Sequence, residues 1–302
     1  MMHYYSLNEY CRDEFGHKLY KLALDGGMTC PNRDGKIGTG GCVFCSEDGS
    51  GEFASKKCGS IFQQIENAKV RVAHKNKSGK YIAYFQSFTN TYAPTEYLRE
   101  IFNEAVSHPD IEVLSVATRP DCLPDDVVEL LSELNSIKPV WVELGFQTSN
   151  EKSAQYIGRG YGNEIFASAV SRLSEKGIKT VAHIILGLPG ETYEDMEKSV
   201  KYVCKQGIWG IKLHLLHILK GARIEKDYLD GRFECFDEKS YLETVCNLLR
   251  IIPSDVVIHR LTGDGDKRKL IAPLWSANKK EVLSSMAEMM REKNIRQGSD
   301  CK

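Results

Sequence analysis

The sequence predicts an α/β protein built around a parallel β-sheet. Short apolar runs rich in β-branched and aromatic residues alternate with amphipathic segments of helical period, which is the pattern of repeated βαβ units. The 302 residues are 42% hydrophobic and 27% charged, as in globular proteins that bury a large core. No period of 20–50 residues repeats, so a solenoid is excluded. Six strands suit either a partial barrel or an open doubly wound sheet, and periodicity does not choose between them.

Six apolar runs predict the strands of this sheet. They are too short to be amphipathic helices, and helical patterns separate them. The predicted strands are Leu19–Leu24, Tyr81–Phe88, Glu112–Ala117, Val140–Phe146, Thr180–Leu186 and Ile211–Ile218.

The segments between the strands predict helices, because their apolar residues form single stripes at helical spacing. For the fourth helix, Asn163 is the expected N-cap and Gly177 follows the end. For the fifth helix, Thr192 is the expected N-cap. The helices are expected near Ile61–Ala73, 97–106, 127–134, Asn163–Lys176 and Tyr193–Gln206.

The regular alternation of predicted strands and helices ends after Lys220. A polar stretch leads to a predicted helix at Tyr241–Ile251, a strand at Val256–Leu261 and a basic helix at Lys279–Lys293. We therefore expect a core domain over residues 1–220 and an α/β extension over residues 221–302 that packs on it.

The charge pattern gives no global case for a nucleic-acid partner, because the formal net charge is −1. The C-terminal stretch 267–302 is different, with nine Lys or Arg residues against four Asp or Glu residues. No apolar run reaches the length of a membrane helix, and residues 1–10 do not resemble a secretion signal. We expect a cytoplasmic protein with no membrane partner.

Three of the ten cysteines are clustered in one glycine-rich loop after the first strand. Cys30, Cys42 and Cys45 follow the spacing Cys-x11-Cys-x2-Cys. In a reducing compartment this pattern favours metal binding over disulfides. A structural zinc site needs four ligands, and Cys58 or His74 would have to supply the fourth. Three thiolates on an iron–sulfur cluster would leave one iron open for a ligand. Inert buried thiols are the third interpretation.

The cysteine loop resembles that of radical S-adenosylmethionine (SAM) enzymes. Phe44 stands directly before the last cysteine, as it does in that family, whereas the eleven-residue first gap departs from the usual three. Long first gaps occur in the branch related to the Elongator catalytic subunit, and Cys30-Pro-Asn32 followed by Thr39-Gly-Gly-Cys42 is similar to that branch. The resemblance implies a partial (β/α)6 barrel of the TIM type. It also implies a [4Fe–4S] cluster held by Cys30, Cys42 and Cys45, with SAM on the fourth iron.

Further motifs extend the resemblance over residues 18–220. Glu143-Leu-Gly-Phe-Gln147 and Ile157-Gly-Arg159 resemble the segment after the fourth strand, where Gln147 and Arg159 would hold SAM and Glu143 its ribose. His183-Ile-Ile-Leu-Gly187 resembles the fifth-strand signature, whose backbone lies against the adenine; His183 replaces an acidic residue of related coproporphyrinogen oxidases. At the second strand the family's Gly-Gly-Glu motif is absent. There the residues that would bind the SAM amino group are Gln86, Ser87 and Thr89.

The whole chain resembles compact bacterial proteins of this branch that have no acetyltransferase domain. That resemblance implies a 5′-deoxyadenosyl radical acting on the wobble uridine of tRNA. The reaction would convert a 5-carboxymethylaminomethyl-(2-thio)uridine toward 5-aminomethyl-(2-thio)uridine, ahead of a separate tRNA methyltransferase. A flavodoxin or ferredoxin would be the reductant. The basic residues expected to contact tRNA phosphates are Lys267, Arg268, Lys279, Lys280, Arg291, Lys293 and Arg296.

Two alternatives stay open at this point. One is a radical SAM enzyme that acts on a small metabolite such as a tetrapyrrole. The other is a zinc-stabilised RNA-binding protein without enzymatic activity. The sequence identifies no catalytic residue beyond the cluster ligands.

Overall fold

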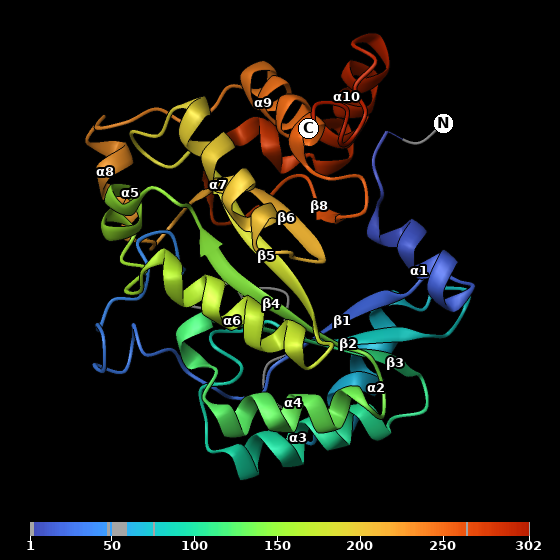
Figure 1. Cartoon of the computed structure of the whole chain (residues 1–302). Helices are drawn as coiled ribbons and strands as arrows, with labels where there is room; N and C mark the ends of the chain where they lie inside the picture. The colour runs from blue at the N-terminus through green and yellow to red at the C-terminus, as the bar shows by residue number, and fades with distance from the viewer. Residues whose placement is uncertain (1–2, 47–48, 50–58, 75, 264, 302) are drawn as a thin grey trace.

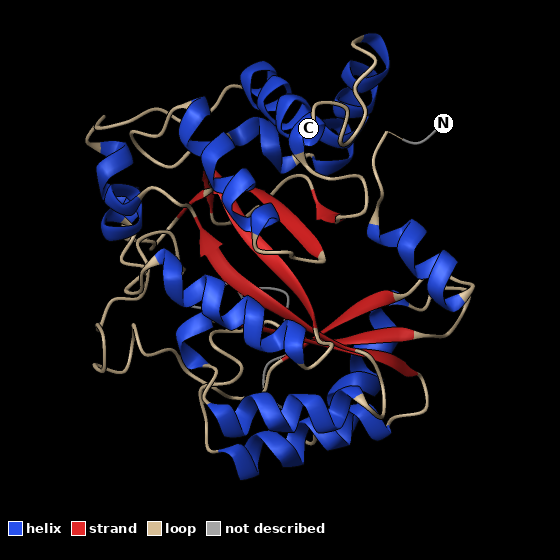
Figure 2. Cartoon of the chain, in the orientation of Figure 1, coloured by secondary structure: helices blue, strands red, loops and turns tan. Residues whose placement is uncertain are grey.

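The computed structural model describes residues 3–46, 49, 59–74, 76–263 and 265–301. Its centre is a parallel sheet that curls into a half-barrel, with helices on the outer face (Figures 1 and 2). The strands lie in chain order across the sheet, as expected for successive βαβ units. In the described part they are β1 (Tyr20–Leu24), β2 (Tyr81–Phe85), β3 (Ile111–Thr118), β4 (Val140–Gln147), β5 (Lys179–Leu186), β6 (Gly210–Leu215) and β8 (Val257–Arg260).

The outer helices bury their apolar faces in the core, and these faces are the apolar stripes from which the helices were predicted. Leu98, Ile101 and Phe102 of α3, for example, are buried in the main core. These helices pack against the strands and against one another. Their bounds are α2 (Ile61–Val72), α3 (Thr95–Ser107), α4 (Asp125–Asn135), α5 (Glu151–Tyr156), α6 (Asn163–Glu175) and α7 (Tyr193–Lys205).

The predicted partial barrel is confirmed, and the C-terminal segment adds a strand to it. β8 pairs in parallel with β6 and becomes the seventh strand of the main sheet. Helix α9 (Glu238–Ile251) packs on α7, and α10 (Lys279–Glu292) packs on α9. A short antiparallel pair, β7 (Ile218–Leu219) with β9 (Leu270–Ala272), and helix α8 (Ile224–Leu229) complete this segment.

Helix α1 (Leu7–Phe15), which the sequence did not predict, lies beside the N-terminal ends of the strands. Its residue Tyr10 packs edge-on against Trp141 and Trp209, with ring centroids 6.0 and 4.7 Å away. The Ile258 N–H of β8 donates to the Tyr5 carbonyl (2.8 Å) just before α1. These aromatic contacts fill that end of the barrel, so the C-terminal ends of the strands remain for a site.

Three local expectations need correction. Gly162, not Asn163, is the N-cap of α6, because the Asn163 side chain is already bonded to Arg159 and Ser149. β2 ends at Phe85, before Phe88, whose φ of 61° is incompatible with a strand. β6 ends at Leu215, and Ile218 pairs with β9 instead.

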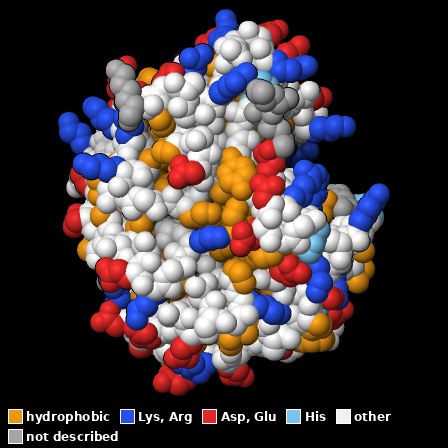
Figure 3. Space-filling model, turned by 45° about the vertical axis from the view of Figure 1, so that its right-hand side comes forward, with side chains coloured by type: hydrophobic (Ala, Val, Ile, Leu, Met, Phe, Trp, Pro, Cys, Tyr) orange, Lys and Arg blue, Asp and Glu red, His pale blue; other side chains and the backbone are white. Residues whose placement is uncertain are grey.

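The described part contains no helix that is long and apolar enough to cross a bilayer. On the face shown in Figure 3, Lys and Arg side chains are interspersed with Asp and Glu side chains. This mixture agrees with the net charge of −1.

Candidate active site

A cavity of about 290 Å³ lies at the C-terminal ends of the barrel strands. This is the end at which barrel enzymes place their active sites. The cavity gathers residues from the cysteine loop and from the ends of most strands. Of the predicted site residues, it is lined by Cys30, Cys42, Cys45, Gln86, Thr89, Glu143, Gln147, Arg159 and His183.

The other two predicted residues do not line this cavity. Ser87 is 4% exposed and is not among the residues that line the cavity. Gly187 has a φ of 86°, and a Cβ there would lie 2.7 Å from the Phe236 ring. Gly187 is therefore required by the turn after β5. Cys58, considered above as a zinc ligand, lies outside the described residues.

The cysteine loop is held in shape by its own backbone and by the segment after α5. The Gly41 N–H donates to the Asn32 carbonyl (2.7 Å), and Gly41 adopts a φ of 70°, which favours glycine. The Val43 N–H donates to the Ile157 carbonyl (3.1 Å). These bonds fix a loop whose first gap is eleven residues long.

The Asn32 side chain connects the Cys42 thiol to the segment after α5. Its Nδ2 donates to Cys42 Sγ (3.3 Å) and to the Gly158 carbonyl (2.8 Å), which uses both amide hydrogens. The hydrogen bond from Cys45 lowers the pKa of the Cys42 thiol to about 7, and burial opposes this effect. The Asn32 hydrogen bond and the charges of Arg119 and Arg33 contribute to the same shift. The loop therefore favours a thiolate, the form that binds metals.

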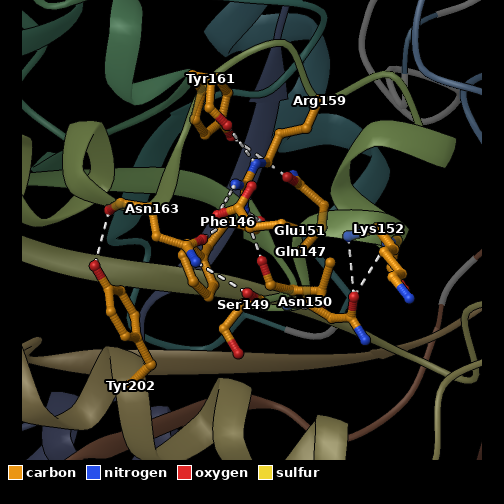
Figure 4. A network of polar contacts seen from close by, with 12 residues as sticks. Phe146, Gln147, Ser149, Asn150, Glu151, Lys152, Arg159, Tyr161, Asn163 and Tyr202 are labelled. Carbon is orange, nitrogen blue, oxygen red and sulfur yellow. Dashed lines mark hydrogen bonds and ion pairs between the residues drawn. The ribbon is translucent and has the colours of Figure 1, made fainter.

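Arg159 is 1% exposed and is held by backbone carbonyls at the end of β4 (Figure 4). Its Nη1 donates to the carbonyl oxygens of Phe146 (3.2 Å) and Thr148 (2.6 Å). Its Nε donates to the Tyr161 carbonyl (2.9 Å). Nη2 is buried without a hydrogen-bond partner among the described residues, although Glu151 Oε1 lies 3.6 Å away. One donor thus remains for a bound anion.

A bulge at the end of β4 places Gln147 in the cavity. The register with β5 shifts between Gly145 and Gln147, and Gln147 has a φ of 64°. A Cβ on Gly145 would lie 2.5 Å from Gln147 Nε2, so a larger residue there would displace the Gln147 amide. The Tyr161 hydroxyl donates to the Gly145 carbonyl and caps the bulge. Left-handed conformations of non-glycine residues are costly and cluster at functional sites.

Glu143 lies on the cavity floor, and its side chain has no solvent exposure. Oε1 accepts from Lys21 Nζ (2.5 Å) and Ser115 Oγ (2.8 Å). Oε2 accepts from Lys212 Nζ and lies 2.8 Å from His183 Nε2. Burial alone would raise the pKa of the Glu143 carboxyl, but the charges of Lys21 and Lys212 hold it well below its ordinary value. The predicted ribose contact stays a prediction, since protein groups already occupy both oxygens.

Several cavity residues were missed at the sequence level. Arg119 follows β3, forms a bidentate pair with Asp121 and stacks over the Tyr161 ring at 4.9 Å. Lys212 is 3% exposed, within an apolar strand. The sequence signal that could have identified Lys212 was a lysine within an otherwise apolar run. Tyr84 and Arg260 also line the cavity.

The chain belongs to the radical SAM superfamily. Residues 34–203 match the radical SAM superfamily model, and residues 208–292 match the radical SAM C-terminal domain. Over 295 residues the chain is 46% identical to the uncharacterized protein YtqA of Bacillus subtilis (strain 168). This match covers 98% of this chain and 92% of YtqA.

The relatives also include Elongator-like proteins. The fold matches the archaeal Methanocaldococcus infernus Elp3 with a TM-score of 0.70 at 16% identity, over 92% of this chain and 64% of that one. The chain is 22% identical to the tRNA uridine(34) acetyltransferase of Methanocaldococcus jannaschii over 189 residues. That match covers 62% of this chain and 34% of the relative.

The family's cofactors are a [4Fe–4S] cluster and SAM, and the cavity residues fit both. Three thiols without disulfides converge on one space, with a side-chain amide and two arginines beside Cys42. The Nη2 of Arg159, which makes no hydrogen bond among the described residues, is a donor for a carboxylate. Membership of the radical SAM superfamily favours a cluster over a structural zinc ion, and an enzyme over a zinc-stabilised RNA-binding protein.

Proposed function

We propose that this protein modifies the wobble uridine of tRNA, converting 5-carboxymethylaminomethyl-(2-thio)uridine toward 5-aminomethyl-(2-thio)uridine. One observation carries the proposal: three cysteines and most of the predicted SAM residues line one cavity, in a fold that matches Elp3 over 92% of the chain. The similarity to a tRNA uridine(34) acetyltransferase supports a uridine at that position of tRNA as the target.

The site supports this chemistry through binding and orientation. When bound, the cluster and SAM supply a 5′-deoxyadenosyl radical that removes a hydrogen atom from the substrate. Arg159, Gln147, Gln86 and Thr89 would hold SAM against the cavity wall. Loss of a hydrogen atom from the carboxymethyl carbon beside the side-chain nitrogen, and then of one electron to an oxidised flavodoxin or ferredoxin, would give an iminium group. Hydrolysis by water would release the carboxymethyl group as glyoxylate and leave the aminomethyl group on the uridine.

The proposal includes partners for the steps before and after this reaction. A flavodoxin or ferredoxin would deliver the electron that SAM cleavage requires. A tRNA methyltransferase would consume the aminomethyl product. These partners and a tRNA substrate imply a cytoplasmic location.

The test is turnover of defined tRNA by the anaerobically reconstituted protein with SAM and dithionite. We expect 5′-deoxyadenosine and a new aminomethyl nucleoside, detected by mass spectrometry, when the tRNA carries the carboxymethylaminomethyl group. A Cys42→Ser variant should form neither product. If 5′-deoxyadenosine forms with a small-metabolite pool but not with this tRNA, the tRNA proposal is wrong and a small-molecule radical SAM enzyme takes its place.

A further inference from the structure

The cavity wall formed by β6 and β8 is basic. Lys212 and His214 of β6 and Arg260 of β8 all line it. These strands lie at the opposite edge of the sheet from β1, after which the cysteine loop follows. The cavity therefore has a cysteine side, with Arg33 and Arg119 beside Cys42, and a second group of basic residues on β6 and β8.

Two lysine ammonium groups share a single carboxylate beneath this basic wall. The ammonium groups of Lys21 and Lys212 both contact Glu143, one on each carboxylate oxygen. Across the described ranges, Glu143 is the one carboxylate within 4.0 Å of either ammonium. The Tyr84 ring lies 4.4 Å from Lys21 Nζ and 4.7 Å from Lys212 Nζ, and it contributes no charge. The Lys21 side chain is 23% exposed, whereas that of Lys212 is 4% exposed. The cost of the second cation therefore falls on Lys212, unless Lys212 gains an anion or loses its proton.

His214 provides an independent sign of an absent partner. Its Nε2 is buried and has no hydrogen-bond partner among the described residues. Its ring lies 5.2 Å from that of His183, on the cavity wall. Buried polar atoms are normally satisfied, so an unpartnered imidazole nitrogen beside a surplus ammonium indicates a place for a ligand.

We propose that Lys212 and His214, with Arg260 beside them, bind the carboxylate of the substrate's carboxymethyl group. This inference rests on the proposed function, which supplies a substrate with that acid. A carboxylate at this position would give Lys21 and Lys212 one acid each and would accept a hydrogen bond from His214. The aminomethyl product lacks the carboxylate, so the same contacts would distinguish substrate from product.

Protonation supplies a second signature of the proposed subsite. Burial lowers the pKa of Lys212 well below its ordinary value, which Glu143 opposes and the charges of Lys21 and Arg260 reinforce. A carboxylate binding beside Lys212 should therefore bring up to one proton with it. The charged and titratable groups around this ammonium are Lys21, Tyr84, Glu143, His183, His214, His259 and Arg260.

The experiment compares two probes that differ by the carboxylate. N-benzylglycine has the amine and acid of the modified side chain, and N-methylbenzylamine lacks the acid. Calorimetric titration of the SAM-loaded holoenzyme, in two buffers of different ionisation enthalpy, gives affinity and proton uptake. We expect N-benzylglycine to bind at least tenfold more tightly than N-methylbenzylamine, with proton uptake.

The variants Lys212→Met and His214→Leu should each weaken the binding of N-benzylglycine at least tenfold. His214→Gln, which keeps a donor, should weaken it less.

A matched control is Lys179→Met, which removes a half-buried strand lysine that contacts Tyr10 outside the cavity. Its affinity for N-benzylglycine should match wild type. Equal affinity for both probes, or unchanged affinity in both the Lys212 and His214 variants, would overturn the subsite. Binding of N-benzylglycine to SAM-free protein but not to SAM-loaded protein would also overturn it, because the carboxylate bound there would then be that of SAM.

Failure of the proposed function gives a different result. If wild-type protein leaves the tRNA unmodified while the probes behave as expected, a carboxylate subsite stands and the tRNA reaction does not. If the tRNA is modified while both variants keep the wild-type KM for it, the reaction stands and the subsite is wrong. Circular dichroism and the cluster absorption confirm that each variant is folded and loaded.

Discussion

Asn32 influences the cluster site without being a ligand. Its amide donates to Cys42 Sγ and to the Gly158 carbonyl, which joins the cysteine loop to the segment that carries Arg159. Hydrogen bonds to ligand sulfurs stabilise their negative charge and raise the reduction potential of a cluster. Asn32 is therefore a positioning residue for both halves of the cofactor site.

We expect Asn32→Asp to weaken cluster retention by about 10–100-fold, because a carboxylate removes the donor and adds a negative charge beside the thiolate. The measurement is iron released to a chelator over time from the anaerobically reconstituted protein, together with the reduction potential, which should fall. Asn103→Asp is the control, since Asn103 is an exposed residue of α3 that bonds to its own helix. Equal iron release from the two variants would contradict the assigned role of Asn32.

Helix α9 holds the seventh strand in the barrel through a buried tyrosine. Tyr241 has no solvent exposure, and its hydroxyl donates to the Leu261 carbonyl (2.8 Å) directly after β8. Tyr241→Phe leaves the packing but removes the donor, which should lower the free energy of unfolding by about 1–2 kcal/mol. Urea unfolding measures this loss.

The control is Tyr5→Phe, which removes an exposed hydroxyl bond to Asp13 and should cost less than about 0.5 kcal/mol. Similar losses in both variants would show that the buried bond contributes little.

Helix α10 and the turn after it carry exposed cations. Lys280, Arg291 and Arg296 are exposed. Two other predicted tRNA contacts, Arg268 and Lys293, already form ion pairs with Asp266 and Glu243. If the three exposed cations contact phosphates, changing them all to Glu should reduce the slope of log affinity for tRNA against log salt by about 2–3.

The matched control for this prediction changes Lys198, Lys201 and Lys205 to Glu. These residues are exposed on α7, so the change in net charge is the same. Filter binding of tRNA across a salt series should separate the two triple variants. An equal reduction in slope would show that net charge, and not the position of α10, controls tRNA binding.

Local signals were sufficient to predict much of the whole molecule. The order of the strands, the Thr192 cap and the grouping of the three cysteines depend on neighbours in sequence, and all three are found in the structure. The contacts of Glu143 were not predictable in this way. Lys21 is 122 residues away and Lys212 is 69 residues away, and a strand lysine is ordinarily expected at the surface. The place of β8 was missed for the same reason, because its partner is set by how the sheet curls.

The barrel interior makes the stability of the whole molecule sensitive to acid. Burial lowers the pKa of His183 to about 4, and the charge of Lys212 reinforces this shift. Burial also lowers the pKa of His259 well below its ordinary value, and the charge of Lys21 adds to it. In the unfolded chain both histidines take up protons near pH 6.5. Below that pH the unfolded state binds protons that the folded state does not, so stability falls as the pH drops from about 6.5 toward 4.

His259 allows this origin of acid sensitivity to be tested outside the cavity. Its ring packs between Trp141 and Trp209, with centroids 5.8 and 5.0 Å away, and neither ring nitrogen has a partner among the described residues. Phenylalanine keeps the packing and does not titrate. Between pH 7 and pH 5.5 we expect His259→Phe to lose about 1 kcal/mol less stability than wild type in urea unfolding. An equal loss in both proteins would mean that His259 is already protonated in the folded barrel, or that other groups control the acid response.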